Sequence, residues 1–402
     1  MARLADLAQQ RLQFPLKHGV HSPPQISTPR VLARIREVVN DMVTPSWLPS
    51  VPHKFGDKFS GTLKADEWRV MTTVYLPIAL ISLWGTGTIH RSNSDTIYLR
   101  TVLNHTMDLV CAVSVACLRT MTLNRMDAYL RYLKSWVSGM KDLHPSSNHT
   151  INGHMAFHIY DFLRLFGPAR SWWCFPFERL IGQLQNLTHN HKHGELEARM
   201  ATSFLQGARL RQWINRPDCP AILKECKILF DKALGNDVGE DDKPADSAYI
   251  STPAIMRCFV KSHKVALRAR YRVNQTTYCR SSTHVGNSLV MFYPEGDKSR
   301  EPVPGCIEHI ILEPNGEATF TIRRQLPALP GFVDPYIEWP HFPARVYNTS
   351  LSPQLEGVDP EWIVSHYARW AFDKNHAVVL NLSRVCVYWW LMLGIHLTPL
   401  QE

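Results

Sequence analysis

Three side chains between positions 154 and 161 have the types and spacing of a site for a cation or a phosphate. His154 and His158 are four positions apart, so a helix places both imidazoles on one face, and Asp161 follows one turn later. Imidazole and carboxylate groups are common ligands of metal ions in proteins. No glutamate stands between the histidines as a base and no second ligand pair is evident, so buried or solvated histidines are the alternative.

Glu178 is a second candidate, in the stretch SWWCFPFERLIGQL. Pro176 is suited to the start of a helix, which would place the Glu178 carboxylate in the first turn, where the helix dipole favours negative charge. Bulky side chains around it would form a dry wall, and such a wall suits a metal-ligating acid. A structural acid paired with a neighbouring base fits the same pattern. The wall would consist of Trp172, Trp173, Phe175 and Phe177.

A basic run with interleaved aromatic residues, RCFVKSHKVALRARYR, covers residues 257–272. The cations of such a run can hold phosphates, and its aromatic rings can stack on bases. A solvated basic face has the same composition. A further basic loop, HNHKH, covers residues 189–193. The predicted nucleic-acid-binding residues are Arg179, Lys192, Arg257, Lys261, Lys264, Arg268, Arg270 and Arg272.

The charge of the chain is unevenly distributed. The formal net charge is +9 at pH 7, and residues 1–235 hold 28 Lys and Arg against 17 Asp and Glu, whereas the remainder holds 16 against 18. A basic surface favours polyanions such as nucleic acid, but it also aids solubility. The GxxxxGKS, GxGxxG and GxSxG motifs are absent, so the sequence lacks the signatures of nucleotide hydrolases, dinucleotide-binding enzymes and esterases.

The cysteines and the apolar stretches indicate an intracellular protein without membrane spans. Nine cysteines form no CxxC pair, and their odd number indicates reduced thiols. The first residues lack the apolar core of a secretory signal. Three apolar stretches are shorter than the roughly 20 residues that cross a bilayer, so they predict buried helices or strands. They cover residues 74–84, 109–118 and 385–395.

Helices must position most of these candidates, and apolar residues recur at helical spacing through the first half of the chain. Thr28 can cap, and Pro29 can begin, the helix TPRVLARIREVVNDMV. Residues 63–140 predict at least three helices, with a kink at Pro77. Further helices are predicted over residues 153–167, 194–214 and 220–234.

Beyond residue 250 the pattern changes to short alternating strands. Strands are predicted in SLVMFYPEGD, CIEHIILEPNGEATFTIRRQL and AVVLNLSR, with PNGE as a hairpin turn and one helix near residues 360–370. The predicted fold class is α+β, with a mainly helical N-terminal half followed by a small β-rich, barrel-like domain. The predicted divisions are a lead-in segment (1–60), a helical domain (61–235), an acidic linker (236–249), the β-rich domain (250–384) and an atypical tail (385–402).

The stretch HMAFHIYDFLRLFGPARSWWCFPFERLIGQL resembles the transposase-associated domain of CACTA-type (En/Spm-like) DNA transposases. In that family a histidine-bearing helix leads through a Gly-Pro turn to an aromatic Pro-Phe-Glu-Arg segment. The stretches FYPEGD, DPYIEWPHFPARVY, WIVSHYARWAF and HAVVLNLSR resemble the small C-terminal domain that follows in the same proteins. The resemblance covers residues 1–384.

The resemblance implies a DDE enzyme with an RNase H-like core, in which three carboxylates hold two Mg²⁺ or Mn²⁺ ions for attack on a DNA phosphodiester. It implies that Glu178 is the third, catalytic acid and that the helices of residues 63–140 are an insertion in the core. The two earlier aspartates should precede this insertion on strands, and Asp6, Asp41 and Asp57 lack strand-like surroundings. We therefore expect a nuclear, transposase-derived fragment that binds DNA without strand-transfer activity and without a bound metal of its own.

Two other functions fit the same sequence. The first is a protein-interaction module, in which the β-rich domain binds a transposase or chromatin partner. The second is a metal-dependent nuclease, whose metal ligands would be His154, His158, Asp161 and Glu178.

Overall fold

The computed structural model describes most of the chain, and contacts divide it into two units. One unit consists of Met1–Ser171 together with Asp246–Glu402, and Trp172–Ala245 forms the other. In the second unit the predicted helix is confirmed as α9 (Leu196–Ile214). The described residues are 28–57, 63, 65–87, 94–143, 151–172, 174, 177, 181, 195–214, 216, 218–220, 222–223, 225–226, 249–273 and 276–383.

The first helix, α2 (Pro29–Asp41), begins as its sequence predicts. The backbone N–H of Val31 donates to the Thr28 hydroxyl oxygen at 3.3 Å, and Pro29 needs no N–H partner in the first turn. After α2 the chain joins the sheet through a bridge between Val43 and Arg369, with N–H···O distances of 2.8 and 3.0 Å. Residues 28–57 are thus part of the first unit rather than a separate lead-in segment.

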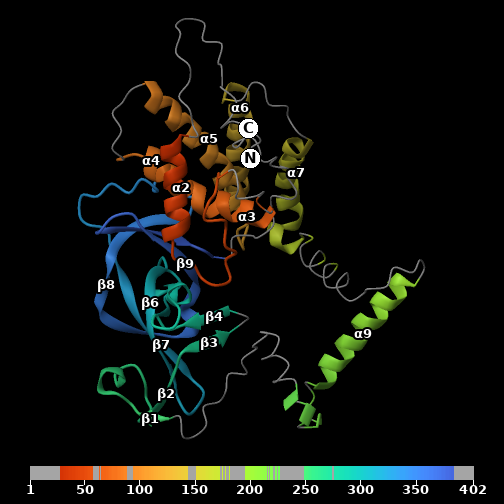
Figure 1. Ribbon diagram of the computed structural model, residues 1–402, viewed down its shortest axis with the longest axis vertical. Helices are drawn as coiled ribbons and strands as arrows, with labels where there is room; N and C mark the ends of the chain where they lie inside the picture. Colours follow the sequence, from red (N-terminus) through yellow and green to blue (C-terminus); the bar gives the residue numbers. More distant parts are fainter. Residues whose placement is uncertain are drawn as a thin grey trace, which may run out of the picture. The chain divides into compact units, whose positions relative to one another are not determined.

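The predicted group of helices follows α2 (Figure 1). A π-helical turn directly precedes the α-helix that contains Pro77. In the five residues before α4 the backbone hydrogen bonds run from i to i+5. Proline lacks the N–H that would continue an α-helix and its ring crowds the preceding turn, and a wider turn accommodates both effects. The helices are α3 (Ala65–Val70), η1 (Met71–Tyr75), α4 (Leu76–Trp84), α5 (Ser94–Ala116), α6 (Leu123–Leu143), α7 (Ile151–Phe166) and η2 (Ala169–Ser171).

The helix α7 ends where the Gly-Pro pair predicts. Gly167 has φ +75°, a left-handed conformation that terminates helices and that glycine adopts without a steric penalty, and its N–H donates to the Leu163 carbonyl at 3.1 Å. The inner face of α7 buries Ala156, Ile159 and Leu163. This face packs against α6.

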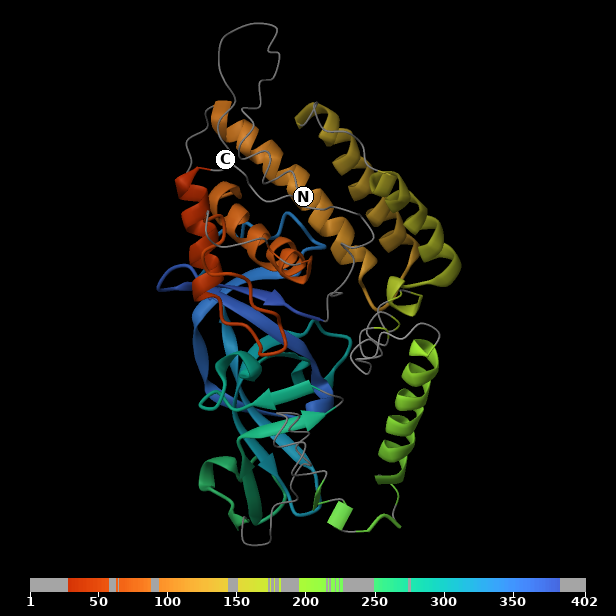
Figure 2. The ribbon, with the colours of Figure 1, turned by 45° about the vertical axis from the view of Figure 1, so that its right-hand side comes forward.

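The second half of the first unit contains a closed, antiparallel, six-stranded β-barrel (Figure 2). The order around the barrel is β5-β6-β7-β8-β10-β9, and β9 pairs with β5 to close it. Two short strands, β1 and β2, extend the sheet beyond β6. The strands are β1 (Ile250–Ser251), β2 (Lys264–Arg268), β5 (Leu289–Phe292), β6 (Val303–Leu312), β7 (Ala318–Pro327), β8 (Ala344–Val358), β9 (Ile363–Ala371) and β10 (His376–Asn381).

The predicted PNGE turn is confirmed between β6 and β7. Gly316 has φ +89°, and the Glu313 N–H donates to the Glu317 carbonyl at 2.9 Å. The predicted helix near residues 360–370 is wrong, because only η6 (Pro360–Trp362) is helical and β9 follows it. Both faces of β9 are covered, so its sequence lacks the alternation of polar and apolar residues that reveals a half-exposed strand.

The helices and the barrel share one hydrophobic core. On β9, Ala368 and Trp370 are buried against α2 and α4 in one cluster, whereas Tyr367 belongs to a cluster with Met291 and Val379. Since successive side chains of a strand point to opposite faces, the first set faces the helices outside the barrel and the second set lies inside it. The described parts of residues 61–171 and 250–384 therefore form one unit, not two domains joined at a linker.

The apolar stretches 74–84 and 109–118 lie almost wholly buried in η1, α4 and α5, as predicted. The third stretch, residues 385–395, lies outside the described residues. Within the described chain, no helix combines the length and the apolar character needed to cross a membrane. Most of the acidic segment 236–249 also lies outside the description.

Candidate nucleic-acid interface

The last residues of the basic run begin a small β-hairpin beside the barrel. Strand β3 (Arg270–Val273) pairs antiparallel with β4 (Thr276–Cys279), and Ala269 alone separates β3 from β2. The register sets Tyr271 opposite Tyr278 and sets Arg272 opposite Thr277. Alternation along the two strands therefore places the tyrosines on one face of the hairpin and the arginines of β3 on the other.

Aromatic contacts attach the first face to the barrel. The Tyr271 ring meets Phe320 edge-on at 5.5 Å between ring centroids, and the Tyr278 ring lies 5.7 Å from the same phenylalanine. Tyr278 also stacks on His366 at 5.0 Å. Such aromatic pairs are worth about 0.5–1.5 kcal/mol each beyond the area they bury, so the barrel fixes the orientation of the hairpin.

The other face carries the cations. Arg270 is exposed and Arg272 is half-buried. On β2, which precedes the hairpin in the chain and belongs to the other sheet, Lys264 is exposed and Arg268 is half-buried. The predicted basic residues of β2 and β3 thus lie on two consecutive strands, where the rigid scaffold positions them rather than a loop.

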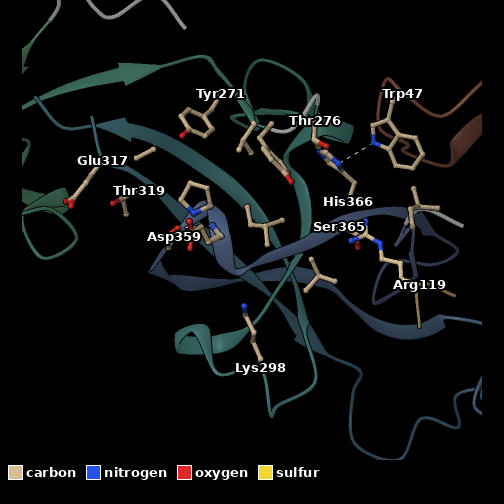
Figure 3. Close-up of a pocket in the computed structure, with 18 of the residues that line it drawn as sticks. Trp47, Arg119, Tyr271, Thr276, Lys298, Glu317, Thr319, Asp359, Ser365 and His366 are labelled. Carbon is tan, nitrogen blue, oxygen red and sulfur yellow. Dashed lines mark hydrogen bonds between the residues drawn. The ribbon is translucent and has the colours of Figure 1, made fainter. Parts of the chain in front are cut away.

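A pocket of about 840 Å³ opens between the hairpin and the barrel (Figure 3). Its walls come from β3 and β4, from the start of β7, and from η6 and β9. Segments far apart in the chain supply its cations, which are Arg119, Lys261 and Lys298. Acidic side chains also line it, namely Glu317, Asp359 and Glu361. The lining is therefore balanced in charge, whereas the two arginines of β3 lie on the other face of the hairpin.

A buried carboxylate holds the loop that carries Lys261. Glu313 is only 4% exposed, and its oxygens accept the backbone N–H groups of Lys261 at 3.4 Å and of Ser262 at 2.9 Å. The Thr252 hydroxyl donates to the Ser262 carbonyl at 2.7 Å. These bonds fix the backbone from which the exposed Lys261 side chain reaches the pocket.

His366 is locked as a neutral imidazole at the edge of the pocket. The indole N–H of Trp47 can only donate, so Nδ1 of His366 accepts it at 3.2 Å, as the dashed line in Figure 3 shows. Nε2 then carries the proton and faces the Asn287 carbonyl oxygen at 3.3 Å. Both ring nitrogens are engaged by the protein, so His366 serves as a wall and a stacking partner rather than as a base.

The helix α7 carries the two histidines and the aspartate of the predicted cation site. The Nε2 atoms of His154 and His158 are 3.2 Å apart, whereas Asp161 lies on the other side of the His158 ring, 4.0 Å from Nδ1. The three side chains therefore do not converge on one point. Among the described residues, no three His, Cys, Asp or Glu side chains form a group that could hold a metal ion.

Several predicted residues lie outside the described part of the chain. They include the proposed catalytic acid Glu178 and two of the predicted DNA-binding cations, Arg179 and Lys192. Arg257 is described, and it is exposed just after η4 (Ala254–Met256).

Sequence reasoning missed Trp47, Arg119, Lys298 and His366 as parts of the pocket. They are separated by tens to hundreds of positions and share no motif, so only the closed barrel brings them together. Tyr271 was included in the basic run because aromatic residues alternate with cations there.

Comparison of the chain with protein-family models, with curated proteins and with solved structures gave no match in any of the three.

Proposed function

We propose that this chain binds DNA through the outer face of the β3–β4 hairpin and the adjoining strand β2. The observation that carries the proposal is the division of the hairpin into an aromatic face that packs on the barrel and a face that bears Arg270 and Arg272. A two-stranded β-ribbon fits the major groove of B-DNA. Arginine side chains on such a ribbon bind phosphates and release condensed counterions.

The pocket complements this surface. Lys261, Lys298 and Arg119 line it with cations, and Tyr271 adds an aromatic ring to the lining. A nucleotide that leaves the base stack would find both a phosphate partner and a ring contact there. The mixed charge of the lining favours a few specific contacts over a continuous electrostatic groove.

The resemblance to CACTA-type transposases supports DNA as the polyanion, and we propose that the chain derives from such an element and acts in the nucleus. On this proposal the helical part belongs to an RNase H-like core, and Glu178 is its third acid. The proposal concerns binding, and it assigns no step to Mg²⁺ or Mn²⁺.

The test is fluorescence anisotropy of a labelled DNA duplex, titrated with the full chain at several salt concentrations. The double substitution Arg270→Ala and Arg272→Ala should weaken binding roughly tenfold or more at 0.1 M salt and reduce the slope of log K against log[salt] by about 2. The matched control is Arg30→Ala with Lys134→Ala, which removes the same charge from exposed positions on α2 and α6. An equal effect of both double variants would show that net charge, not the hairpin, governs binding.

A protein-interaction module is the second candidate, and the exposed side of α7 favours it. Ile151 is 81% exposed, Met155 is 46% exposed and Leu165 is 72% exposed. Large apolar side chains gathered on one helix face are common at protein–protein interfaces. Ile151→Asp with Leu165→Asp should abolish capture of a specific protein partner if this candidate is right, and should leave DNA binding unchanged if the first one is.

A further inference from the structure

The imidazoles of His154 and His158 face each other on the solvent side of α7. Their Nε2 atoms are 3.2 Å apart, and the rings are nearly perpendicular, with an interplanar angle of 80°. Both side chains are exposed, so a hydrated ion can reach them. In the neutral pair one Nε2–H donates to the other nitrogen, and both atoms thus point toward the same small region of space.

The separation of these nitrogens matches the bite of a tetrahedral metal ion. At a metal–nitrogen distance of about 2.0 Å and a tetrahedral angle, two imidazole ligands lie about 3.3 Å apart. The observed 3.2 Å therefore requires almost no movement of either ring. Replacing the shared proton by a cation would retain both rotamers.

Asp161 occupies the position of an outer-shell partner. Its carboxylate lies 4.0 Å from Nδ1 of His158, the ring nitrogen that faces away from His154. A carboxylate on that side favours the proton on Nδ1 and leaves the Nε2 lone pair for a metal, as in many histidine-ligated zinc sites. The same geometry prevents Asp161 from ligating the ion between the two histidines.

The helix that carries the pair is held firmly from its other face. The Tyr129 hydroxyl of α6 donates to the Ala156 carbonyl at 2.8 Å, between the two histidines in the sequence. Ala156 and Ile159 are buried against α6. The backbone positions of His154 and His158 are therefore set before any ion binds, which lowers the entropic cost of chelation.

We propose that His154 and His158 chelate a divalent transition-metal ion of the Zn²⁺, Ni²⁺ or Cu²⁺ class, with water completing the coordination sphere. Imidazole nitrogen suits these ions, and affinity should rise from Ni²⁺ to Cu²⁺ and fall again at Zn²⁺. The ion would join successive turns of α7 and stabilise that helix. This inference does not depend on the proposed DNA binding, which uses other residues and no metal.

The test is isothermal titration of Zn²⁺ and Ni²⁺ into the full chain, in a background where His189, His191 and His193 are replaced by Gln to remove the HNHKH cluster. His154→Gln or His158→Gln should weaken binding at least about tenfold, because one remaining imidazole cannot chelate. Asp161→Asn should weaken it by up to about tenfold. The matched control is the exposed His53→Gln, which should leave the affinity unchanged.

Hydrogen exchange is a second measurement, and because it reports on α7 alone it is insensitive to ions bound elsewhere in the chain. In the protein with both histidines, Zn²⁺ should slow amide exchange within Ile151–Phe166, and in His158→Gln it should not. Absence of any binding by the parent protein would overturn the proposal. Undiminished affinity in both histidine variants, or α7 protection in His158→Gln, would also overturn it.

Discussion

The indole N–H of Trp47 donates a hydrogen bond to Nδ1 of His366 at 3.2 Å, joining residues 319 positions apart. Trp47 belongs to the segment that follows α2, and His366 lies in β9 of the barrel. The bond fixes the tautomer of a histidine that is 2% exposed and that stacks on Tyr278 of the hairpin. A residue of the helical part thereby positions the wall of the proposed DNA-binding site.

Removal of this donor should destabilise the protein. Trp47→Phe keeps an aromatic ring but leaves the buried Nδ1 of His366 without the indole N–H, which should cost about 1–3 kcal/mol. Urea denaturation followed by circular dichroism measures the change in the free energy of unfolding. The control is Trp213→Phe on α9, since Trp213 is 40% exposed and Trp47 is 39% exposed. Equal losses in the two variants would contradict the role of the hydrogen bond.

Gly286 should tolerate no side chain. It lies in the short helix α11 (Val285–Ser288), and a Cβ there would come within 1.8 Å of the Thr44 carbonyl oxygen. The atoms that the added carbon would meet are backbone atoms of Thr44 and Pro45, which cannot rotate away as a side chain can. Gly286→Ala must therefore push α11 away from this segment and should cost about 3 kcal/mol or more. The control is Gly153→Ala on α7, where the added carbon meets no described atom within 4 Å beyond its chain neighbours and the helix's own backbone. That change should stabilise the helix by about 0.5–1 kcal/mol, as thermal denaturation would show.

Stability should fall as the solution becomes mildly acidic. Burial lowers the pKa of His105 below its ordinary value of 6.5, although its Nε2 donates to the Trp136 carbonyl at 2.9 Å. Burial also lowers the pKa values of His309 and His341. Below the ordinary pKa the unfolded chain binds more protons than the folded chain, so stability is lost as pH falls from the unfolded value toward the lowered folded values.

The measurement is the free energy of unfolding between about pH 7.5 and pH 5, above the ordinary pKa values of aspartate and glutamate. His105→Gln should flatten the dependence, because glutamine keeps a donor for the Trp136 carbonyl and takes up no proton. A slope unchanged by His105→Gln would show that other groups govern the acid sensitivity.

Two tyrosines join α6 and α7, and burial should separate their effects. The Tyr129 hydroxyl donates to the Ala156 carbonyl inside the protein, whereas the Tyr160 hydroxyl donates to Asp127 at 3.1 Å on the surface. Tyr129→Phe should cost about 1 kcal/mol, because a buried hydrogen bond is lost. Tyr160→Phe should cost less than about 0.5 kcal/mol, because water can donate to the exposed Asp127 carboxylate in place of the lost hydroxyl. Urea denaturation of both variants distinguishes the two, and a reversed order would contradict the assignment.

The parts of the fold that could be predicted from sequence depend on local chemistry. The Thr28 hydroxyl caps α2, Gly167 ends α7 and Gly316 makes the β6–β7 turn, and each needs only its near neighbours. The barrel-like character of the second half was also predicted and is confirmed as a closed barrel. These features follow from side-chain capping and from the freedom of glycine, which do not depend on distant residues.

The pairings that create the pocket depend on distant residues and escaped prediction. Val290 of β5 pairs with His366 of β9, and no local sequence pattern predicts this pairing. Strand β9 was mistaken for a helix because it is covered on both sides, so its apolar residues do not alternate. The apparent boundary near residue 240 follows a change of composition, whereas Ile78 and Trp370 belong to the same core on either side of it.

That shared core also sets the order in which the protein can be completed during synthesis. The carbonyl of Ile78 accepts the Tyr336 hydroxyl at 3.2 Å, and the two residues are 258 positions apart. At a synthesis rate of about 5–20 residues per second, roughly 10–50 s separate their emergence from the ribosome. Helix α4, apolar on every side, has no barrel to cover it during this interval. Until the barrel strands have emerged, the part of this apolar helix that they cover in the finished protein stays exposed on the nascent chain.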